Sequence, residues 1–570
     1  MNSIFVIFIF IQSKFQFPQM MQIVKVFLTS IFSFCGFACL AQKTTYYSKQ
    51  DSLRGSIGIG RKKWDVRHYN LTVEPDIRNK TIKGSNTITY LDSGVTLMQI
   101  DLQKPMQIDS IVFESKNCSY KREGNVFWVS LPQSSNFKIS KKTITVYFQG
   151  KPREAIRAPW DGGWVWEKDA QKKPFVSVAC QGLGASVWYP CKDTQSDEPD
   201  EGCDLNIIVP DSLVGIGNGR MIKNEKLPGN KTIYSWRVTS PINNYNIIPY
   251  IGNYTHFSET FKGLKGPLSM DYWVLQQNLD KAKIQFEDAG KMMAAFEYWM
   301  GSYPFYEDGF KLVEAPYLGM EHQSNIAYGN NYLKGYEGYD RSGSGWGLLW
   351  DYIIVHESGH EWFANNITTN DIADMWVHEG FTTYTETLFT EYYYGKEAGN
   401  QYNFGLRSNI NNNANIIGPY GVNKEGSSDM YDKGSNMIHT IRQVIDNDSL
   451  FRAILIGLNQ RFYQRTVNTE DIENYISKMS GKDLSSIFNQ YLRTTKIPRL
   501  EYYIEKNQFI YRWTNTVPNL LLPIKIKFSE SESFKWITPG SDWKKIIINK
   551  ASIPIIDPNF YIDSQEKQPF

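Results

Sequence analysis

Charge of one sign, closely spaced cysteines and long apolar runs are all scarce in this sequence. Its 570 residues include 61 Lys and Arg against 59 Asp and Glu, which gives a formal net charge of +2. Because basic and acidic residues are nearly equal in number, the composition favours neither a nucleic-acid-binding protein with a basic patch nor a protein with a polybasic membrane-binding surface. No two cysteines have the C-x-x-C spacing, which argues against a zinc site built from cysteines. The length predicts two to four domains.

The N-terminus is the one membrane-like region. An apolar stretch at 26–41 follows a lysine and ends with Cys39 and two small or apolar residues before a glutamine. This pattern is typical of a secretory signal with a small-residue cleavage site, so we expect a signal peptide at 1–41, with Met20 or Met21 as the alternative true start. Cleavage would leave no stable membrane span and an exported protein, periplasmic or extracellular. A membrane tether through Cys39, or retention of the segment as an anchor, is the alternative.

Four cysteines follow the predicted cleavage site, and an exported protein can pair them. The sequence leaves two interpretations open, disulfide pairing and buried free thiols. The residues concerned are Cys118, Cys180, Cys191 and Cys203.

Two strand-rich regions flank a helix-rich one. Residues 42–256 alternate apolar and polar residues between Gly, Pro and Asn turns, as in 143–148, which predicts an antiparallel β domain. Residues 257–497 change to helical spacing, which begins with apolar residues at that spacing over 282–299. Strand patterns return in 498–570, which suits a small β-sandwich. The predicted fold class is therefore multidomain α+β.

A His-Glu-x-x-His motif lies in the helix-rich region. His356 and His360 are four residues apart, so on a helix both imidazoles can reach one Zn²⁺, and Glu357 would lie beside the open metal position. The alternative is a solvated helix face that carries two histidines by chance. The flanks predict a buried apolar stripe made of Leu348, Leu349, Tyr352, Ile353 and Phe363.

A third ligand is available downstream. Glu379 lies in a second helical run that extends to Tyr394, and two histidines with one carboxylate leave a coordination position for water. The clustering of histidines favours a shared site over scattered core positions, because four of the seven lie within 57 residues: His322, His356, His360 and His378. The sequence therefore predicts one catalytic Zn²⁺ per chain, with Glu357 as general base.

Several ordered segments resemble the motifs of one family, the gluzincin aminopeptidases, to which aminopeptidase N and leukotriene hydrolase belong. The ten residues from His356 resemble H-E-x-x-H-x-W-F-G-N, and 374–381 resembles D-x-W-L-N-E-G-F. Residues 318–322 stand in the place of G-x-M-E-N, and 430–434 matches Y-x-K-G. Residues 180–194 are similar to the N-terminal segment that feeds the leukotriene hydrolase cleft.

The resemblance implies a thermolysin-like zinc domain at 257–497 and an aminopeptidase that acts on peptides with a free N-terminus. The balanced charge argues against nucleic acid as a partner. Glu357 would take a proton from the attacking water and pass it to the leaving amine. Tyr431 would donate its hydroxyl to the developing oxyanion. Glu321, with Gln181, would bind the substrate's α-ammonium. The other implied residues are Gly319 and Met320 against the substrate, and Glu386 and Asp374 as residues that orient the ligands.

Departures from the family motifs leave side-chain preference open, although none removes a ligand or the base. Leu318 and Ala364 replace glycines, while His322 and His378 replace asparagines. Long family members add a helical domain after the small β domain, so we expect a more open cleft here. The alternative functions are epoxide hydrolysis, suggested by 180–194, a related endopeptidase, and a non-catalytic peptide-binding module on the peptidase scaffold.

Overall fold

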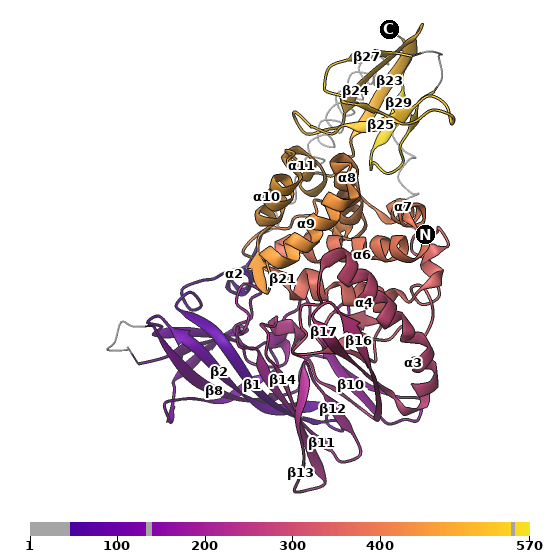
Figure 1. Ribbon diagram of the computed structural model, residues 1–570. Helices are drawn as coiled ribbons and strands as arrows, with labels where there is room; N and C mark the ends of the chain where they lie inside the picture. Colours follow the sequence, from indigo (N-terminus) through magenta and orange to yellow (C-terminus); the bar gives the residue numbers. More distant parts are fainter. Residues whose placement is uncertain (1–45, 133–138, 549–552, 570) are drawn as a thin grey trace, which may run out of the picture. The chain divides into compact units, whose positions relative to one another are not determined.

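The computed structural model describes residues 46–132, 139–548 and 553–569 (Figure 1). The predicted signal peptide, 1–41, lies outside the described residues. The chain divides into two compact units, of which the larger spans Lys49–Phe570. Among the residues described, none of the helices has both the length and the apolar character needed to cross a bilayer.

An eight-stranded sheet dominates the first part of the unit, after the short helix α2 (Lys49–Gly55). The long strands β1 and β2 alternate buried and more exposed residues over most of their length, as the sequence predicts. Neighbouring strands run antiparallel except β1 and β11, which pair in parallel. In spatial order the strands are β13 (Arg220–Leu227), β14 (Lys231–Val238), β11 (Cys203–Pro210), β1 (Trp64–Asp76), β2 (Thr81–Asp92), β8 (Ser140–Gly150), β4 (Gln107–Phe113) and β5 (Lys116–Asn117).

Two smaller sheets complete this region. The first has the order β12 (Val214–Ile216), β15 (Tyr250–Gly252), β10 (Pro174–Ala179) and β9 (Gly163–Lys168), and the second has the order β3 (Leu97–Asp101), β7 (Val126–Ser130) and β6 (Tyr120–Glu123). The turn that follows β10 carries Gln181, so this sheet positions one predicted site residue.

A five-stranded sheet begins the helix-rich region. Its order is β16 (Tyr254–Gly263), β17 (Gly266–Leu275), β18 (Phe310–Glu314), β20 (Ile326–Tyr328) and β19 (Gly319–Met320). Gly319 is required for close approach at its edge: a Cβ there would lie 2.8 Å from Glu357 Oε1 and 2.9 Å from the Ile353 side chain. The absence of a side chain therefore lets β19 lie directly against the helix that carries Glu357.

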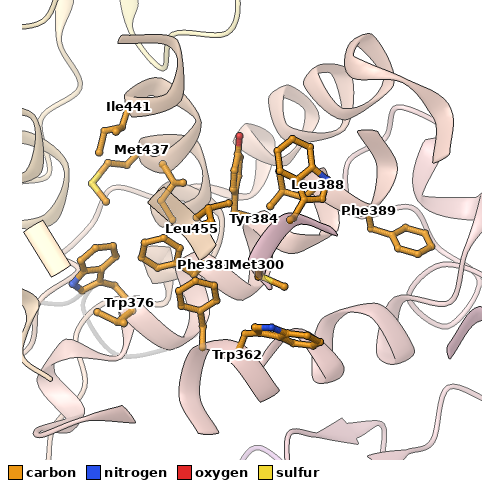
Figure 2. Close-up of a cluster of buried hydrophobic side chains, with 14 of the residues drawn as sticks. Met300, Trp362, Trp376, Phe381, Tyr384, Leu388, Phe389, Met437, Ile441 and Leu455 are labelled. Carbon is orange, nitrogen blue, oxygen red and sulfur yellow. The ribbon is translucent and has the colours of Figure 1, made fainter. Parts of the chain in front are cut away.

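Helices α4, α5, α7 and α8 pack against α6, whose apolar residues recur at helical spacing. Figure 2 shows Phe381, Tyr384 and Leu388 of this helix in one buried cluster with side chains from α8 and α9. The helices are α3 (Leu279–Gln285), α4 (Glu287–Met300), α5 (Tyr352–Gly359), α6 (Trp376–Tyr394), α7 (Lys396–Gly405), α8 (Asp432–Ile445), α9 (Asp448–Arg461), α10 (Thr469–Ser480) and α11 (Ser485–Leu492). A two-stranded pair, β21 (Ile367–Thr369) and β22 (Arg465–Val467), lies among them.

The helical spacing predicted over 282–299 corresponds to two helices. Helix α3 ends and α4 begins on either side of Phe286, whose ψ is 0°. The Phe286 ring is buried, with its centroid 4.8 Å from that of Tyr328. Tertiary packing of this ring accompanies a break that helical periodicity alone does not reveal.

The last part of the unit forms two small sheets, as expected for a β-sandwich. One has the order β27 (Lys544–Ile547), β24 (Gln508–Thr514), β23 (Arg499–Glu505) and β29 (Asp563–Glu566), and the other has the order β26 (Lys535–Ile537), β25 (Ile524–Lys527) and β28 (Ile555–Ile556). The multidomain α+β class is confirmed, while the domain limits at 256 and 497 stay predictions.

Candidate active site

Helix α5 carries His356 and Glu357 of the His-Glu-x-x-His motif, has His360 as its C-cap residue, and begins at a well-defined cap. The Asp351 carboxylate accepts hydrogen bonds from Ile354 N at 3.2 Å and from Gln285 Nε2 at 2.6 Å, which satisfies an N-terminal amide of the helix. At the other end, a Cβ on Gly359 would lie 2.6 Å from Thr385 Oγ1 of α6. This glycine therefore allows α5 and α6 to approach closely, which brings the motif histidines to the helix that carries Glu379.

The apolar stripe predicted for this helix is wrong in part. Leu348 and Leu349 are 44% and 47% exposed and lie in a 3₁₀ turn before α5. Tyr352, Ile353 and Phe363 are buried, as predicted. The reason is that the helix begins only at Tyr352, so the two leucines do not share its periodicity.

Ala364 follows α5 in a π-helical segment, Glu361–Asn365, with a φ of 145°. Glycine adopts such a φ readily, whereas a Cβ makes it costly. The departure from the family's glycine at this position is therefore accommodated as backbone strain, one residue after the Phe363 carbonyl that contacts His360 Nδ1.

The three predicted ligands converge on one point. Glu379 Oε2 lies 3.3 Å from His360 Nε2 and 3.8 Å from His356 Nε2. The opposite ring nitrogens contact protein groups: His356 Nδ1 lies 2.7 Å from Glu386 Oε1, and His360 Nδ1 lies 3.1 Å from the Phe363 carbonyl. Such contacts fix the ring orientation and tautomer of a histidine ligand, which leaves Nε2 free for a metal.

The same residues fit a zinc ion. Glu379 Oε2 is buried and has no hydrogen-bond partner in the described part of the chain, although a buried carboxylate oxygen normally has one. Ligand atoms about 2.0–2.1 Å from a tetrahedral Zn²⁺ lie roughly 3.3 Å apart, close to the observed spacing. A metal cation between the three side chains would satisfy this oxygen. Cys118, Cys180, Cys191 and Cys203 are free and take no part in the site.

Glu357 lies beside this point with only 9% of its surface exposed. Burial raises the pKa of its carboxyl to about 7; the neighbouring histidines oppose the rise, and Glu321 and Glu379 add to it. A group with a pKa near neutrality can both accept and return a proton, which is the property required of a general base.

Tyr431 stands at the N-terminus of α8, and its ring centroid is 6.2 Å from that of His356. Burial, together with the charges of Glu379 and Glu321, raises the pKa of its hydroxyl well above the usual value. The hydroxyl therefore stays protonated at neutral pH and can act as a hydrogen-bond donor.

A second carboxylate, Glu321, has an oxygen within 4.8 Å of ligand atoms of Glu357 and His360 and is 2% exposed. Its Oε1 accepts hydrogen bonds from Gln181 Nε2 at 2.5 Å and from the Tyr245 hydroxyl at 2.9 Å. Burial raises its pKa. Tyr245 was missed by sequence reasoning, because a lone tyrosine outside any motif gives no signal among 35 tyrosines.

An open pocket of about 860 Å³ joins these groups. Its wall also includes residues that sequence reasoning missed, among them Trp160, Arg341 and Glu425. The predicted site residues that line it are Gln181, Gly319, Met320, Glu321, His356, Glu357, His360, Glu379 and Tyr431.

The two residues predicted to orient ligands occupy different places. Glu386 lies behind His356 and also accepts from the Tyr402 hydroxyl at 2.7 Å. Asp374 does not face a ligand: its Oδ1 accepts from the Tyr420 and Thr469 hydroxyls, each at 2.6 Å. The structure therefore brings Glu386, but not Asp374, to the ligand set.

The two histidines that replace family asparagines are buried and neutral. His322 Nδ1 lies 2.6 Å from the Tyr250 hydroxyl, and His378 Nε2 accepts from Thr369 N at 2.9 Å. Burial lowers the pKa of each to about 3. These contacts hold the segments beside Glu321 and Glu379 without adding a charge to the pocket.

Two family models match the chain. The model described as the Peptidase family M1 domain matches residues 285–491, and the Peptidase M1 N-terminal domain matches residues 66–245. Together the matched segments contain the ligand set, Glu321 and Gln181.

Curated relatives are distant in sequence. Leukotriene A-4 hydrolase of Xenopus laevis is 23% identical over 446 residues, which cover 73% of this chain and 68% of the relative. Probable aminopeptidase 2 of Sulfurisphaera tokodaii is 21% identical, with 85% and 62% covered, and aminopeptidase N of Lactococcus lactis is 21% identical, with 76% and 51% covered. The chain thus spans between about half and two thirds of the length of these relatives.

Solved structures share the fold. The M1 zinc metallopeptidase of Deinococcus radiodurans superposes with a TM-score of 0.63 at 17% identity, covering 75% of this chain and 93% of that one. A variant of the same enzyme, bound to a Tyr-Ser-Ala substrate, gives a TM-score of 0.64 with 76% and 95% covered.

Proposed function

Because the chain belongs to peptidase family M1, we propose that it is a zinc-dependent aminopeptidase that removes the N-terminal residue from peptides. The observation that carries the proposal is the buried Glu379 Oε2, which faces Nε2 of both His356 and His360 and accepts no hydrogen bond from the residues that the structure describes. A buried carboxylate oxygen without a hydrogen bond is costly unless a cation occupies the space beside it. When bound there, Zn²⁺ would lower the pKa of a water and polarise the substrate carbonyl.

Glu357 and Tyr431 would perform the proton chemistry. The Glu357 carboxylate would take the proton of the attacking water and pass it to the leaving amine, for which a pKa of about 7 is suitable. The protonated Tyr431 hydroxyl would donate to the oxygen of the scissile carbonyl as negative charge develops on it. The presence of both groups in one pocket supports catalysis over the non-catalytic alternative.

Glu321 would make the enzyme an exopeptidase. Its buried carboxylate, held by Gln181 and Tyr245, offers a charge to the α-ammonium of a peptide at one end of the pocket. An ammonium that leaves water must be paired, so a blocked N-terminus would lose this interaction.

Support for an exported location comes from the N-terminal signal pattern alone.

Metal analysis combined with an aminoacyl-anilide assay tests the proposal. We expect about one Zn²⁺ per chain, loss of activity with a chelator, and recovery when zinc is restored. Glu357→Gln should retain zinc and lose most of the rate, because the ligands remain while the base is absent. A Glu357→Gln protein that is folded but lacks metal would show that the roles are misassigned.

A further inference from the structure

An acidic side chain that the proposed chemistry does not use, Glu425, lines the same pocket as the predicted ligands. It is exposed, and in the part of the chain that the structure describes neither a hydrogen bond nor an ion pair reaches its carboxylate. The charges that act on it are those of its neighbour Lys424 and of Glu379. Glu425 is therefore an uncommitted negative charge close to the reaction centre.

The loop that carries Glu425 is anchored beside the start of α6. Gly421 N donates to Asp371 Oδ2 at 2.7 Å, and the Tyr420 hydroxyl donates to Asp374 Oδ1 at 2.6 Å. Asp374, which the resemblance assigned to ligand orientation, thus holds this loop.

The loop also folds tightly upon itself. A Cβ on Gly418 would lie 2.5 Å from the Lys424 carbonyl oxygen, and one on Gly426 would meet the Ile416 carbonyl even more closely. The two glycines therefore allow the outgoing and returning strands of the loop to touch. Backbone packing of this kind holds Glu425 in place in the pocket.

A further contact places the loop next to the proposed amine-binding end. Asn423 Nδ2 donates to the Gly182 carbonyl at 3.2 Å, and Gly182 directly follows Gln181, the partner of Glu321. The side chain of a peptide's first residue starts at the carbon that bears the α-ammonium. It therefore lies near this loop when the ammonium is bound by Glu321.

The basic residue of the pocket wall already has an acidic partner other than Glu425. Among the described residues that line the pocket, Arg341 is the sole Lys or Arg, and its guanidinium is paired with Asp432 at 3.0 Å. It also donates to the Tyr352 hydroxyl at 2.9 Å. Glu425 therefore has no salt-bridge partner among the described residues, and the one protein cation that acts on it at longer range is its neighbour Lys424.

We infer that Glu425 selects peptides whose first residue is Arg or Lys, with the side-chain cation paired to its carboxylate. This inference rests on the proposed aminopeptidase function. An ion pair in a partly exposed pocket contributes only modestly to affinity. A substrate whose first side chain is a cation would still gain this interaction with the Glu425 carboxylate, whereas a substrate with a neutral side chain would not. Specificity is this difference between two substrates.

Two pairs of substrates that differ in charge and little in shape test the inference: arginine and citrulline anilides, and lysine and norleucine anilides. We expect wild-type kcat/KM to favour the charged member of each pair, and the preference to shrink as salt is raised. Glu425→Gln should lower each preference about fivefold by slowing only the charged substrates. Tyr420→Phe removes the hydrogen bond that anchors the loop to Asp374, so it should also lower the preference for the charged substrate, while zinc content stays unchanged.

Glu397→Gln provides a matched control, because it makes the same change in net charge on exposed α7, outside the pocket wall, and should leave both preferences intact. Equal wild-type rates within each pair, or an unchanged preference in Glu425→Gln, would overturn the inference. If the protein were not an aminopeptidase, it would cleave none of the four anilides. If it were an aminopeptidase in which Glu425 does not select basic residues, it would still cleave the norleucine and citrulline anilides.

Discussion

His356 contacts a carboxylate through each ring nitrogen: Nδ1 lies 2.7 Å from Glu386 Oε1, and Nε2 lies 3.8 Å from Glu379 Oε2. The first contact orients the ring and fixes its tautomer, and the second belongs to the proposed metal site. Arg341 and Tyr402 approach the Glu386 carboxylate in turn, which keeps it from rotating away from His356.

Glu386→Gln should therefore weaken zinc binding, because an amide holds the imidazole less strongly than a carboxylate does. We expect a loss of affinity of roughly 10–100-fold, measured by competition with a chromogenic chelator. Asp374→Asn is the matched control: its carboxylate faces Tyr420 and Thr469, so zinc affinity should not change. Equal losses in the two variants would show that the effect is on general stability.

Tyr431→Phe should lower kcat by about 10²–10³-fold, the usual cost of removing one donor to an oxyanion. KM should change little, because the hydrogen bond forms mainly in the transition state. Steady-state kinetics on a leucine anilide provide the measurement, with zinc content determined in parallel. Turnover near that of the wild type would exclude Tyr431 from the chemistry.

Glu321→Gln should lower kcat/KM on peptides with a free N-terminus. The corresponding loss of transition-state stabilisation should be roughly 2–4 kcal/mol, the cost of truncating one partner of a buried charge pair. The amide has nearly the same size, so zinc should be retained. In the wild type, acetylation of one peptide should abolish cleavage, because it removes the charge that Glu321 pairs. If the acetylated peptide were cut internally, or if the variant kept its preference for a free amine, the exopeptidase assignment would fail while the zinc site remained.

Glu198 should give the folded state a measurable pH dependence. Its carboxyl is buried and accepts from Thr368 Oγ1 at 2.6 Å; burial raises its pKa from the ordinary 4.5 to about 8, with Asp200 and Asp197 adding to the rise. Between these two pH values the folded state binds more protons than the unfolded state. Its contribution to stability is therefore complete below about pH 4.5 and is lost as pH rises towards 8.

Glu198→Gln removes this titration, so its free energy of unfolding relative to wild type should increase by about 1 kcal/mol per pH unit across the window. Urea unfolding at several pH values between 5 and 8.5 measures the slope. Glu397→Gln, an exposed carboxylate, should give a flat difference. A flat difference for Glu198→Gln as well would mean that the Glu198 carboxyl has no raised pKa in the folded state.

The sequence by itself determined the groups that are close along the chain or belong to an ordered motif. His356, Glu357 and His360 lie on one helical segment, so their mutual geometry follows from the period of an α-helix. The strand regions at both ends were likewise predictable, since alternation of apolar and polar residues is a local property.

Tertiary structure alone decided which distant groups meet. Tyr245 reaches Glu321 from 76 residues away, and Asn423 in the loop of Glu425 reaches Gly182 from 241 residues away. The meeting of Gln181 and Glu321, 140 residues apart, was expected from the family resemblance and from no local pattern. Motif position treated Glu386 and Asp374 alike, yet only Glu386 faces a ligand. The spacing of residues along a helix or strand determines on which face of that element a side chain lies. Which residue of another element it contacts depends on how closely the two elements pack. Here that packing depends on glycines such as Gly319 and Gly359, whose contacts no local pattern reveals.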